Sequence, residues 1–335
     1  MPVGACSPCI PSRPARALVS PARLADWMIT FQFDGVVDFF ELDPVAYAPA
    51  LGASGMARYR GRLADIAAEL GPRPAEDATT RWSSPDSHTR FTLDWNEQRL
   101  AVLDRDVAEV IWTHARDQRV AAWLEDTARA LAEIEQIDLA IEWAQRATDF
   151  DDGHQSVHAA KYWCELLATH RRSELLAARL AVFRRWPTSS HANALRTAAG
   201  SAWGEHTDEV MTTLSARPRE AVSFALYTLR DVPLAWEVAH SLTLEDDRLW
   251  ADLAKAYEKL DPLAVLPVLT LLTLGELEVA DAKRYRYAAR RLARMRGLAA
   301  GTDKAVEVDA LIAELRETHR RRTRLQQEFD RACLP

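Results

Sequence analysis

Glycine is scarce in this sequence, and no long hydrophobic run is present. The 335 residues include only 12 glycines and 16 prolines, which leaves long stretches free of helix-breaking residues. No convincing alternation of apolar and polar residues, the pattern of a half-buried strand, is found. The most apolar window, residues 263–274, contains Pro267 and is too short to cross a bilayer. These absences argue against a β-rich protein and against a membrane span.

Cysteine is scarce as well. The chain has four cysteines, which are too few for a disulfide scaffold of this length. Cys164 lies inside a helical pattern, where we expect it to pack as a small apolar residue. Cys6-x-x-Cys9 could supply half of a tetrahedral zinc site, but a zinc ion needs four ligands and the other two cysteines are far away. We therefore expect a flexible pair of thiols at this end of the chain.

Histidine offers a second possible metal site. His154 and His158 are four residues apart, beside Asp151 and Asp152, and two histidines at this spacing on one helix face can bind a metal. However, Gly153 begins the next predicted helix, so the two acids are expected to cap it and to complement its dipole. The sequence thus predicts no metal and no cofactor.

Patterns that carry catalysis are missing too. The other histidines show no spacing with a nucleophile or a carboxylate that singles them out. The pairs Gly52-x-x-Gly55 and Gly200-x-x-x-Gly204 lack the lysine and the preceding strand of a phosphate-binding loop. No apolar run of signal-peptide length is found near the N-terminus. We therefore expect a non-catalytic, soluble and cytoplasmic protein.

Helical hairpins dominate what the sequence does contain. The stretch from Val120 to Pro187 predicts two helix–turn–helix units, VAAWLEDTARALAEIEQIDLAIEWAQRATDF and VHAAKYWCELLATHRRSELLAARLAVFRRWP. Apolar residues recur in them at spacings of three and four, and Asp138 lies where the N-cap of a second helix is expected. A hairpin of this size cannot bury two apolar faces by itself, so it requires neighbours of the same kind.

The pattern continues after Pro187 as three further helix pairs. The second helices of successive units start about 26 to 35 residues apart, in the range of tetratricopeptide-type repeats. Two last helices, over about 279–297 and 303–322, are expected to cap the array. The predicted fold is all-α: an α-solenoid of antiparallel helix hairpins, tetratricopeptide-like, in a right-handed superhelical stack.

Four segments are predicted along the chain. Residues 1–20 are rich in Pro, Ser and Arg and are expected to form a disordered arm, and residues 21–71 an N-terminal helical segment. Residues 72–90 are polar and contain prolines, which indicates a linker or a long loop. Residues 91–335 form the predicted solenoid with a basic C-terminal cap, and a helix over about 93–115 begins it.

Charge is unevenly distributed. The formal net charge is −7, but residues 280–335 hold 14 Lys/Arg against 8 Asp/Glu, so the preceding 279 residues carry −13. We expect an apolar stripe in this region (Tyr285, Ala288, Leu292 and Met295) to pack on the preceding hairpin. The candidate partner-binding residues are Lys283, Arg286, Arg290 and Arg294, spaced three, four and four apart, and Arg320, Arg321, Arg322 and Arg324 in the segment ETHRRRTR.

Two interpretations of these cations remain open. They can be a solvated face with cations placed favourably near a helix C-terminus. Alternatively, their density indicates a docking site for carboxylates or phosphates, because a bound anion would relieve their mutual repulsion.

Tryptophan is abundant, with 11 residues in the chain. Bulky rings that recur about once per helix or two are expected to fill gaps between stacked hairpins. Some can instead line the groove in which solenoids bind partners, and Trp123 and Trp163 are the candidates.

Several segments suggest a family. They are THARDQRVAAWLEDTARALAEIEQIDLAIEWAQRATDF, WEVAHSL, LWADLAKAYEKLDPLAVLPV, YRYAARRLARMRGL and LIAELRETHRRRTRLQQEFDRACLP. From about Leu93 to the end, the chain resembles the C-terminal helical region of bacterial SWIM zinc-finger proteins, and LGASGMARYRGRLADIA resembles a segment that precedes that region. The zinc motif of the family, Cys-x-Cys followed by Cys-x-His, has no counterpart here. The resemblance implies a related helical scaffold without the zinc module, and it transfers no catalytic residue.

A protein-interaction scaffold is the predicted function. The partner is expected to be a protein, bound through the groove or through the basic C-terminal end, with no membrane involved. The alternative is a nucleic-acid-associated accessory protein that binds phosphates through its C-terminal arginines. The two differ in salt dependence, because phosphate contacts release counterions and weaken steeply as salt rises.

Overall fold

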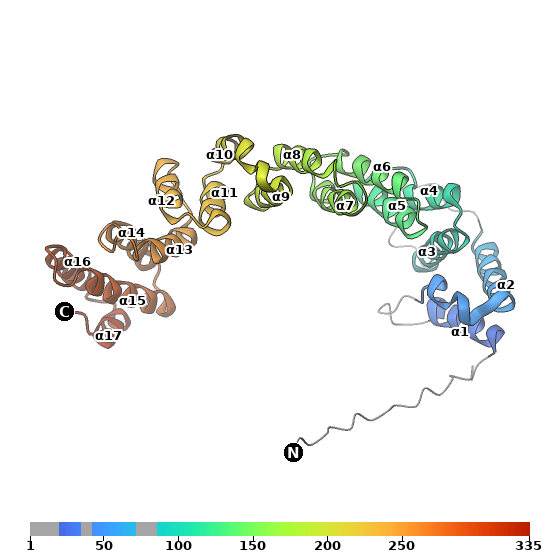
Figure 1. Cartoon of the computed structure of the whole chain (residues 1–335). Coiled ribbons are helices and arrows are strands. Elements are labelled where there is room, and N and C mark those ends of the chain that lie inside the picture. Colours follow the sequence, from blue (N-terminus) through green and yellow to red (C-terminus); the bar gives the residue numbers. More distant parts are fainter. Residues whose placement is uncertain (1–19, 35–41, 72–85) are drawn as a thin grey trace, which may run out of the picture. The chain divides into compact units, whose positions relative to one another are not determined.

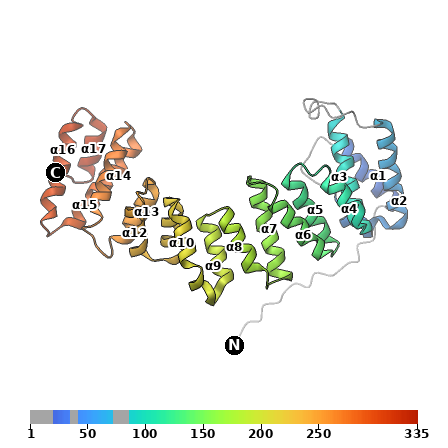
Figure 2. The same ribbon diagram turned by 90° about the horizontal axis from the view of Figure 1, so that it is seen from above.

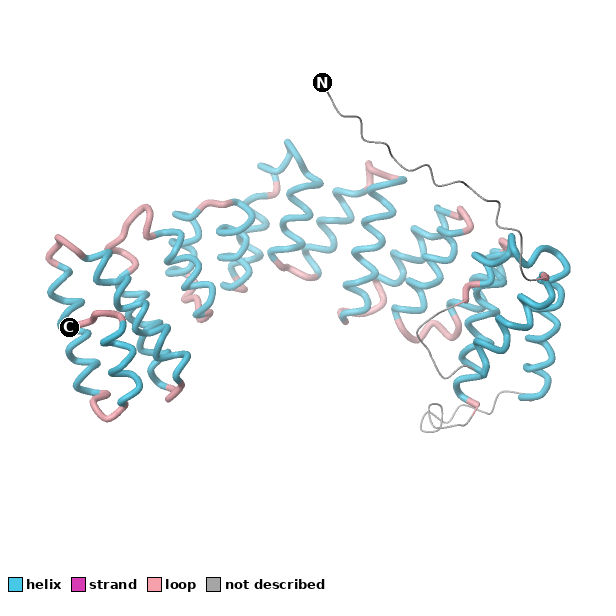
Figure 3. Tube along the Cα trace, turned by 90° about the horizontal axis from the view of Figure 1, so that it is seen from below, coloured by secondary structure: helices cyan, strands magenta, loops and turns pink. Residues whose placement is uncertain are grey.

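The computed structural model describes residues 20–34, 42–71 and 86–335. All regular elements in these ranges are helices (Figures 1 and 3). The chain divides into two compact units, Met1–Arg171 and Arg172–Pro335. The prediction of an all-α protein built from stacked helical hairpins is confirmed in both units.

Unit 1 is a stack of seven described helices. They are α1 (Pro21–Asp34), α2 (Pro44–Leu70), α3 (Ser87–Asp104), α4 (Val107–Ala115), α5 (Ala121–Glu133), α6 (Ile137–Thr148) and α7 (His154–His170). Each helix packs on the next one, and α1, α3, α5 and α7 also pack on one another in that order. Figure 2 shows α5, α6 and α7 side by side. Contacts to the next helix and to the next but one are what a stack of helical hairpins requires.

Unit 2 repeats this arrangement with shorter and less regular helices. They are α8 (Leu175–Arg185), α9 (Ser189–Ala199), the 3₁₀-helix η1 (Gly200–Glu205), α10 (Thr207–Ser215), α11 (Pro218–Ser223), the π-helix η2 (Phe224–Leu229), α12 (Val232–Ser241), α13 (Asp247–Tyr257), α14 (Leu266–Glu278), α15 (Ala282–Ala299), α16 (Lys304–Thr318) and α17 (Thr323–Arg331). Helices α9, α11 and α13 pack in sequence, as do α13, α14 and α15, and α17 packs on α15.

One prediction for the central hairpins is wrong. The first predicted hairpin is α5 and α6, but α6 begins at Ile137 with Gln136 at its N-cap, so Asp138 lies inside the first turn. The Asp138 carboxylate instead accepts a hydrogen bond of 2.5 Å from Arg171. The second predicted hairpin is α7 and α8, and the boundary between the units falls in its turn.

The predicted helix over 93–115 is wrong, because two helices occupy this range. Helix α3 ends where Arg105 adopts a left-handed conformation with φ of 57°. Asp106 then caps α4, since its carboxylate accepts hydrogen bonds from the backbone N–H groups of Ala108 and Glu109. Helix α3 also begins at Ser87, so the end of the predicted linker is helical, whereas residues 72–85 and most of the predicted arm lie outside the described residues.

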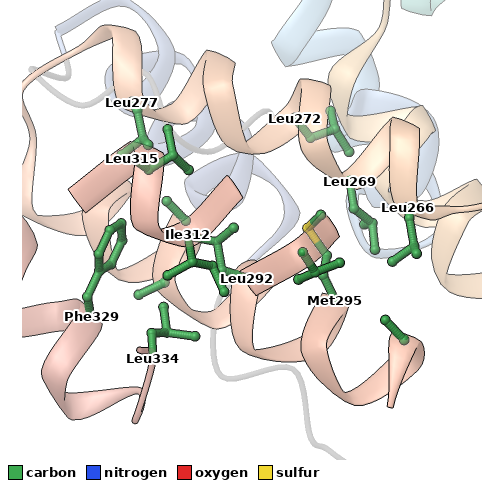
Figure 4. Packing of buried hydrophobic residues seen from close by; sticks show 14 of the residues in the cluster. Leu266, Leu269, Leu272, Leu277, Leu292, Met295, Ile312, Leu315, Phe329 and Leu334 are labelled. Atoms are coloured by element: carbon green, nitrogen blue, oxygen red, sulfur yellow. The ribbon is translucent and has the colours of Figure 1, made fainter. Parts of the chain in front are cut away.

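The C-terminal end contains three helices, α15, α16 and α17, where two were predicted. The segment ETHRRRTR is not a continuous helix: α16 ends at Thr318, and α17 begins at Thr323. One apolar cluster joins these helices to α14, and Figure 4 shows how Leu292, Ile312 and Phe329 meet inside it. Because each of these helices contributes to one core, their relative positions are fixed by packing, and so are the positions of the side chains that point outward.

Candidate functional site

The apolar stripe of α15 determines which side of this helix faces solvent. Tyr285, Ala288, Leu292 and Met295 are all buried, with at most 6% of each residue exposed. They pack in the cluster with α14, α16 and α17, as predicted from their spacing (Figure 4). The opposite side of α15 is therefore left for charged residues.

Three of the four predicted cations on α15 lie on this outward side. Lys283, Arg286 and Arg290 are exposed. The Lys283 ammonium lies 5.9 Å from the centre of the Tyr287 ring, whereas no ion pair or hydrogen bond is found for Arg286 or Arg290 within residues 20–34, 42–71 and 86–335. Their charges are not compensated by neighbouring carboxylates, which leaves them available for an external anion.

Arg294 instead makes contacts within the protein. Its Nε donates a 2.6 Å hydrogen bond to Oε2 of Glu258, at the end of α13, and about a third of the side chain is exposed. The pair joins α13 to α15. Arg291, on the side facing α14, is more deeply buried and lies 4.0 Å from Glu276. Burial lowers the pKa of Arg291, in spite of the nearby carboxylates.

The arginines of the α16–α17 turn are also of two kinds. Arg320 forms an exposed ion pair of 2.8 Å with Glu317, and Arg321 is exposed with no such partner in the described part of the chain. Arg322 donates a 2.6 Å hydrogen bond to the carbonyl oxygen of Leu277, and its guanidinium lies 5.9 Å from the Tyr285 ring centre. Arg322 therefore secures the turn against α14 and α15.

Arg324, the last of the predicted cations, is likewise engaged. It forms an ion pair of 2.8 Å with Glu328, a carboxylate of which only 6% is exposed. Its role is to compensate that buried charge within α17.

An open pocket of about 550 Å³ lies at the α16–α17 turn. It is lined by Glu317, Thr318, His319, Arg320, Arg321 and Arg322. Partial burial, followed by the charge of Arg322, lowers the pKa of His319, so this ring adds little positive charge at neutral pH. The arginines, rather than the histidine, would contact an anion there.

Two further lysines, in and just after α13, were missed by the sequence prediction. Lys255 in α13 and Lys259 in the turn after it are exposed, one helical turn apart. Residues 245–261 contain six Asp/Glu and only three Lys/Arg, so composition places this segment in the acidic part of the chain. The signal that could have found them is the i, i+4 spacing of the two lysines.

The predicted groove residues are only half-buried. In α5, the Trp123 ring lies 5.2 Å from the Arg116 guanidinium. In α7, the indole Nε1 of Trp163 is buried with no hydrogen-bond partner in the described residues. A groove lined by these two rings stays a prediction.

The predicted metal-site candidates have other roles where the structure describes them. Nδ1 of His158 lies 2.8 Å from Glu125, and a 2.5 Å hydrogen bond from Arg129 reaches the same carboxylate. Asp151 accepts hydrogen bonds from the Gly153 N–H and the Ser156 hydroxyl, but Gly153 occupies the N-cap of α7 without a side-chain cap, so the predicted capping by Asp151 is not found. Cys6 and Cys9 lie outside the described residues.

Comparisons with known proteins add no family. The chain matches no model of a known protein family, and a search of curated proteins finds no match either. The resemblance to SWIM zinc-finger proteins therefore stays a prediction. Among the described helices, none is long and apolar enough to cross a membrane.

Proposed function

We propose that this protein is a non-catalytic scaffold that binds an acidic segment of a protein partner through its C-terminal basic surface. This surface is defined by Lys283, Arg286, Arg290, Arg320 and Arg321. The observation that supports the proposal is that Arg286, Arg290 and Arg321 are exposed and uncompensated, on helices whose other sides share a continuous apolar core. Such a surface can bind carboxylates without any rearrangement of the fold.

Nucleic acid is the alternative partner, and the charge of the chain favours a protein. The net charge is −7, and the 279 residues before the basic region carry −13. A long polyphosphate would meet repulsion from this acidic body, whereas a short acidic segment would meet mainly the basic surface. A relationship to the helical region of SWIM zinc-finger proteins and a location in the cytoplasm remain part of the proposal.

The test uses a variant that removes outward charge and leaves the interior intact. Arg286, Arg290, Arg320 and Arg321 are changed to Gln together, while Arg294 and Arg322 are kept because they hold α13, α14 and α15 in place. We expect partners captured by the parent from a lysate of the source cells, and a labelled peptide of about ten glutamates, to bind roughly tenfold or more weakly. The melting curve should barely move.

A matched control separates this effect from net charge. Arg172, Arg196 and Arg230 are exposed in unit 2, outside the basic surface. A variant with these three and Arg217, which is also exposed, changed to Gln loses the same four charges and should bind like the parent. Unchanged binding by the fourfold variant would overturn the proposal. Tighter binding of an oligothymidylate than of the glutamate peptide, with a steep loss as salt rises, would favour the nucleic-acid alternative.

A further inference from the structure

We infer that the basic surface continues onto α13, through Lys255 and Lys259, and that its occupant is an extended acidic protein segment lying across α13 and α15. This inference rests on the proposed function and specifies the extent of the surface and the form of the partner. It comes from where the acidic side chains around α13 are directed, which the sequence does not reveal.

The carboxylates of this segment are mostly engaged within the protein. Asp246 accepts a hydrogen bond from the Leu249 N–H and pairs with Arg219. Asp252 accepts a 2.8 Å hydrogen bond from the Tyr227 hydroxyl of η2. Asp261 accepts hydrogen bonds from the N–H groups of Leu263 and Ala264. Glu258, the remaining acid near the C-terminal end of α13, pairs with Arg294.

The two lysines are therefore left without a carboxylate partner. Asp252 is directed toward η2 and Glu258 toward α15, so these acids occupy the two flanks of α13. Lys255 falls between them on the helix, on the exposed side, and Lys259 follows four residues later. Neither lysine makes an ion pair or a hydrogen bond in the described part of the chain. An acidic stretch of sequence thus presents a basic surface.

The ion pair between Glu258 and Arg294 fixes how this surface meets the row on α15. Helix α14 packs on both α13 and α15, and the ion pair joins α13 to α15 directly. One helical turn before the ion pair lies Lys255 on α13 and Arg290 on α15. Both cations are exposed, and each lies one helical turn from a member of the ion pair that joins the two helices.

This arrangement indicates the form of the partner. An occupant that contacts cations on both helices must present several carboxylates spaced along its chain. A segment with several Asp or Glu residues meets this requirement, whereas a single terminal carboxylate does not. At the opposite end of α13, Arg248 is exposed between the exposed acids Glu245 and Asp247 of the same segment, so that end offers no comparable cationic surface.

Three double variants test the inference on the full chain. Lys255 and Lys259 are changed to Gln in the first, Arg286 and Arg290 in the second, and Arg196 and Arg230 in the third, which is the control with the same change in net charge. The probe is a labelled peptide of about ten glutamates at low salt, and an oligothymidylate of similar length is measured in parallel. We expect the first two variants to bind the peptide roughly threefold to tenfold more weakly, and the control to bind like the parent.

Each other result has a definite consequence. If the Lys255/Lys259 variant binds like the parent while the Arg286/Arg290 variant binds weakly, α13 is not part of the surface and the proposed function survives. If neither variant loses affinity, or if the control loses as much as they do, the inference and the proposed function both fail. If the oligothymidylate binds more tightly than the peptide and depends on the same lysines, the surface is real but an acidic protein segment is the wrong occupant.

Discussion

Arg99 in unit 1 and the outward arginines of α15 in unit 2 serve opposite purposes, although the helical hairpins that carry them are alike. In unit 1, Arg99 of α3 donates hydrogen bonds both to Asp43, the N-cap of α2, and to Glu133 of α5, and only 16% of its side chain is exposed. In unit 2, Arg286 and Arg290 of α15 face solvent and have no such partner among the described residues. A cation is structural where a neighbouring helix supplies a carboxylate, and it is available for binding where none does.

The interiors of the two regions differ as well. The first three helices of unit 1 are joined by buried polar groups: the Tyr59 hydroxyl lies 2.7 Å from Gln32 of α1 and 2.5 Å from Asn96 of α3. The C-terminal helices of unit 2 are joined by an almost wholly apolar cluster (Figure 4). Polar networks fix which helices pair, because a misplaced polar group would be left unsatisfied. An apolar core leaves the charged groups to the surface.

The largest expected effect concerns the apolar core of unit 2. Phe329 in α17 is fully buried, so Phe329→Ala removes a large side chain and leaves a cavity. We expect a loss of about 3–5 kcal/mol in the free energy of unfolding, measured by urea denaturation. Phe91→Ala is the matched control in unit 1, where 58% of the residue is exposed, and it should change stability by less than about 0.5 kcal/mol. Equal effects would contradict the packing of α17.

The second prediction concerns pH and unit 1. His114 in α4 is 7% exposed, and its burial lowers its pKa from 6.5 to about 4. Since the folded protein disfavours the charged ring, unfolded chains bind more protons between these two values. The contribution of His114 to the free energy of unfolding should be fully present above pH 6.5. It should be lost as the pH is lowered toward 4, by on the order of 3 kcal/mol. In His114→Gln this contribution should be absent, so denaturation curves of the two proteins at pH 7 and pH 4.5 provide the measurement.

Most helices could be predicted from the sequence, because each is indicated by the spacing of the apolar residues within it. The buried stripe from Tyr285 to Met295 follows from intervals of three and four. The partners of charged residues could not be predicted, because they lie on other helices. Arg294 and Arg290 look equivalent in a row of cations, and only the position of α13 reveals that Glu258 meets one of them. For the same reason, Lys255 and Lys259 were hidden among acids that turn out to be engaged elsewhere.

The third prediction tests whether Arg99, which pairs with carboxylates of two neighbouring helices, stabilises the fold. Arg99→Gln leaves Asp43 and Glu133 without their shared partner, and both carboxylates are partly buried. We expect a loss of about 1–3 kcal/mol, below the cost of a fully buried pair because solvent still reaches the two acids. Thermal denaturation in low and high salt measures it. A variant as stable as the parent would mean that Arg99 is no more structural than the arginines of the C-terminal surface.

The smallest effect separates two arginines of one helix. Arg294→Gln removes the ion pair with Glu258 and should cost up to about 1 kcal/mol, since both partners are only partly exposed. Arg290→Gln, one turn away, removes an uncompensated charge close to other cations, so its stability should change by less than about 0.5 kcal/mol and should rise slightly at low salt as repulsion is relieved. For binding the order should be reversed, with Arg290→Gln weakening the glutamate peptide more than Arg294→Gln does. If stability and binding instead fall together in both variants, Arg294 and Arg290 do not differ in role. The distinction between cations that pair within the protein and cations that are free to bind a partner would then fail on α15.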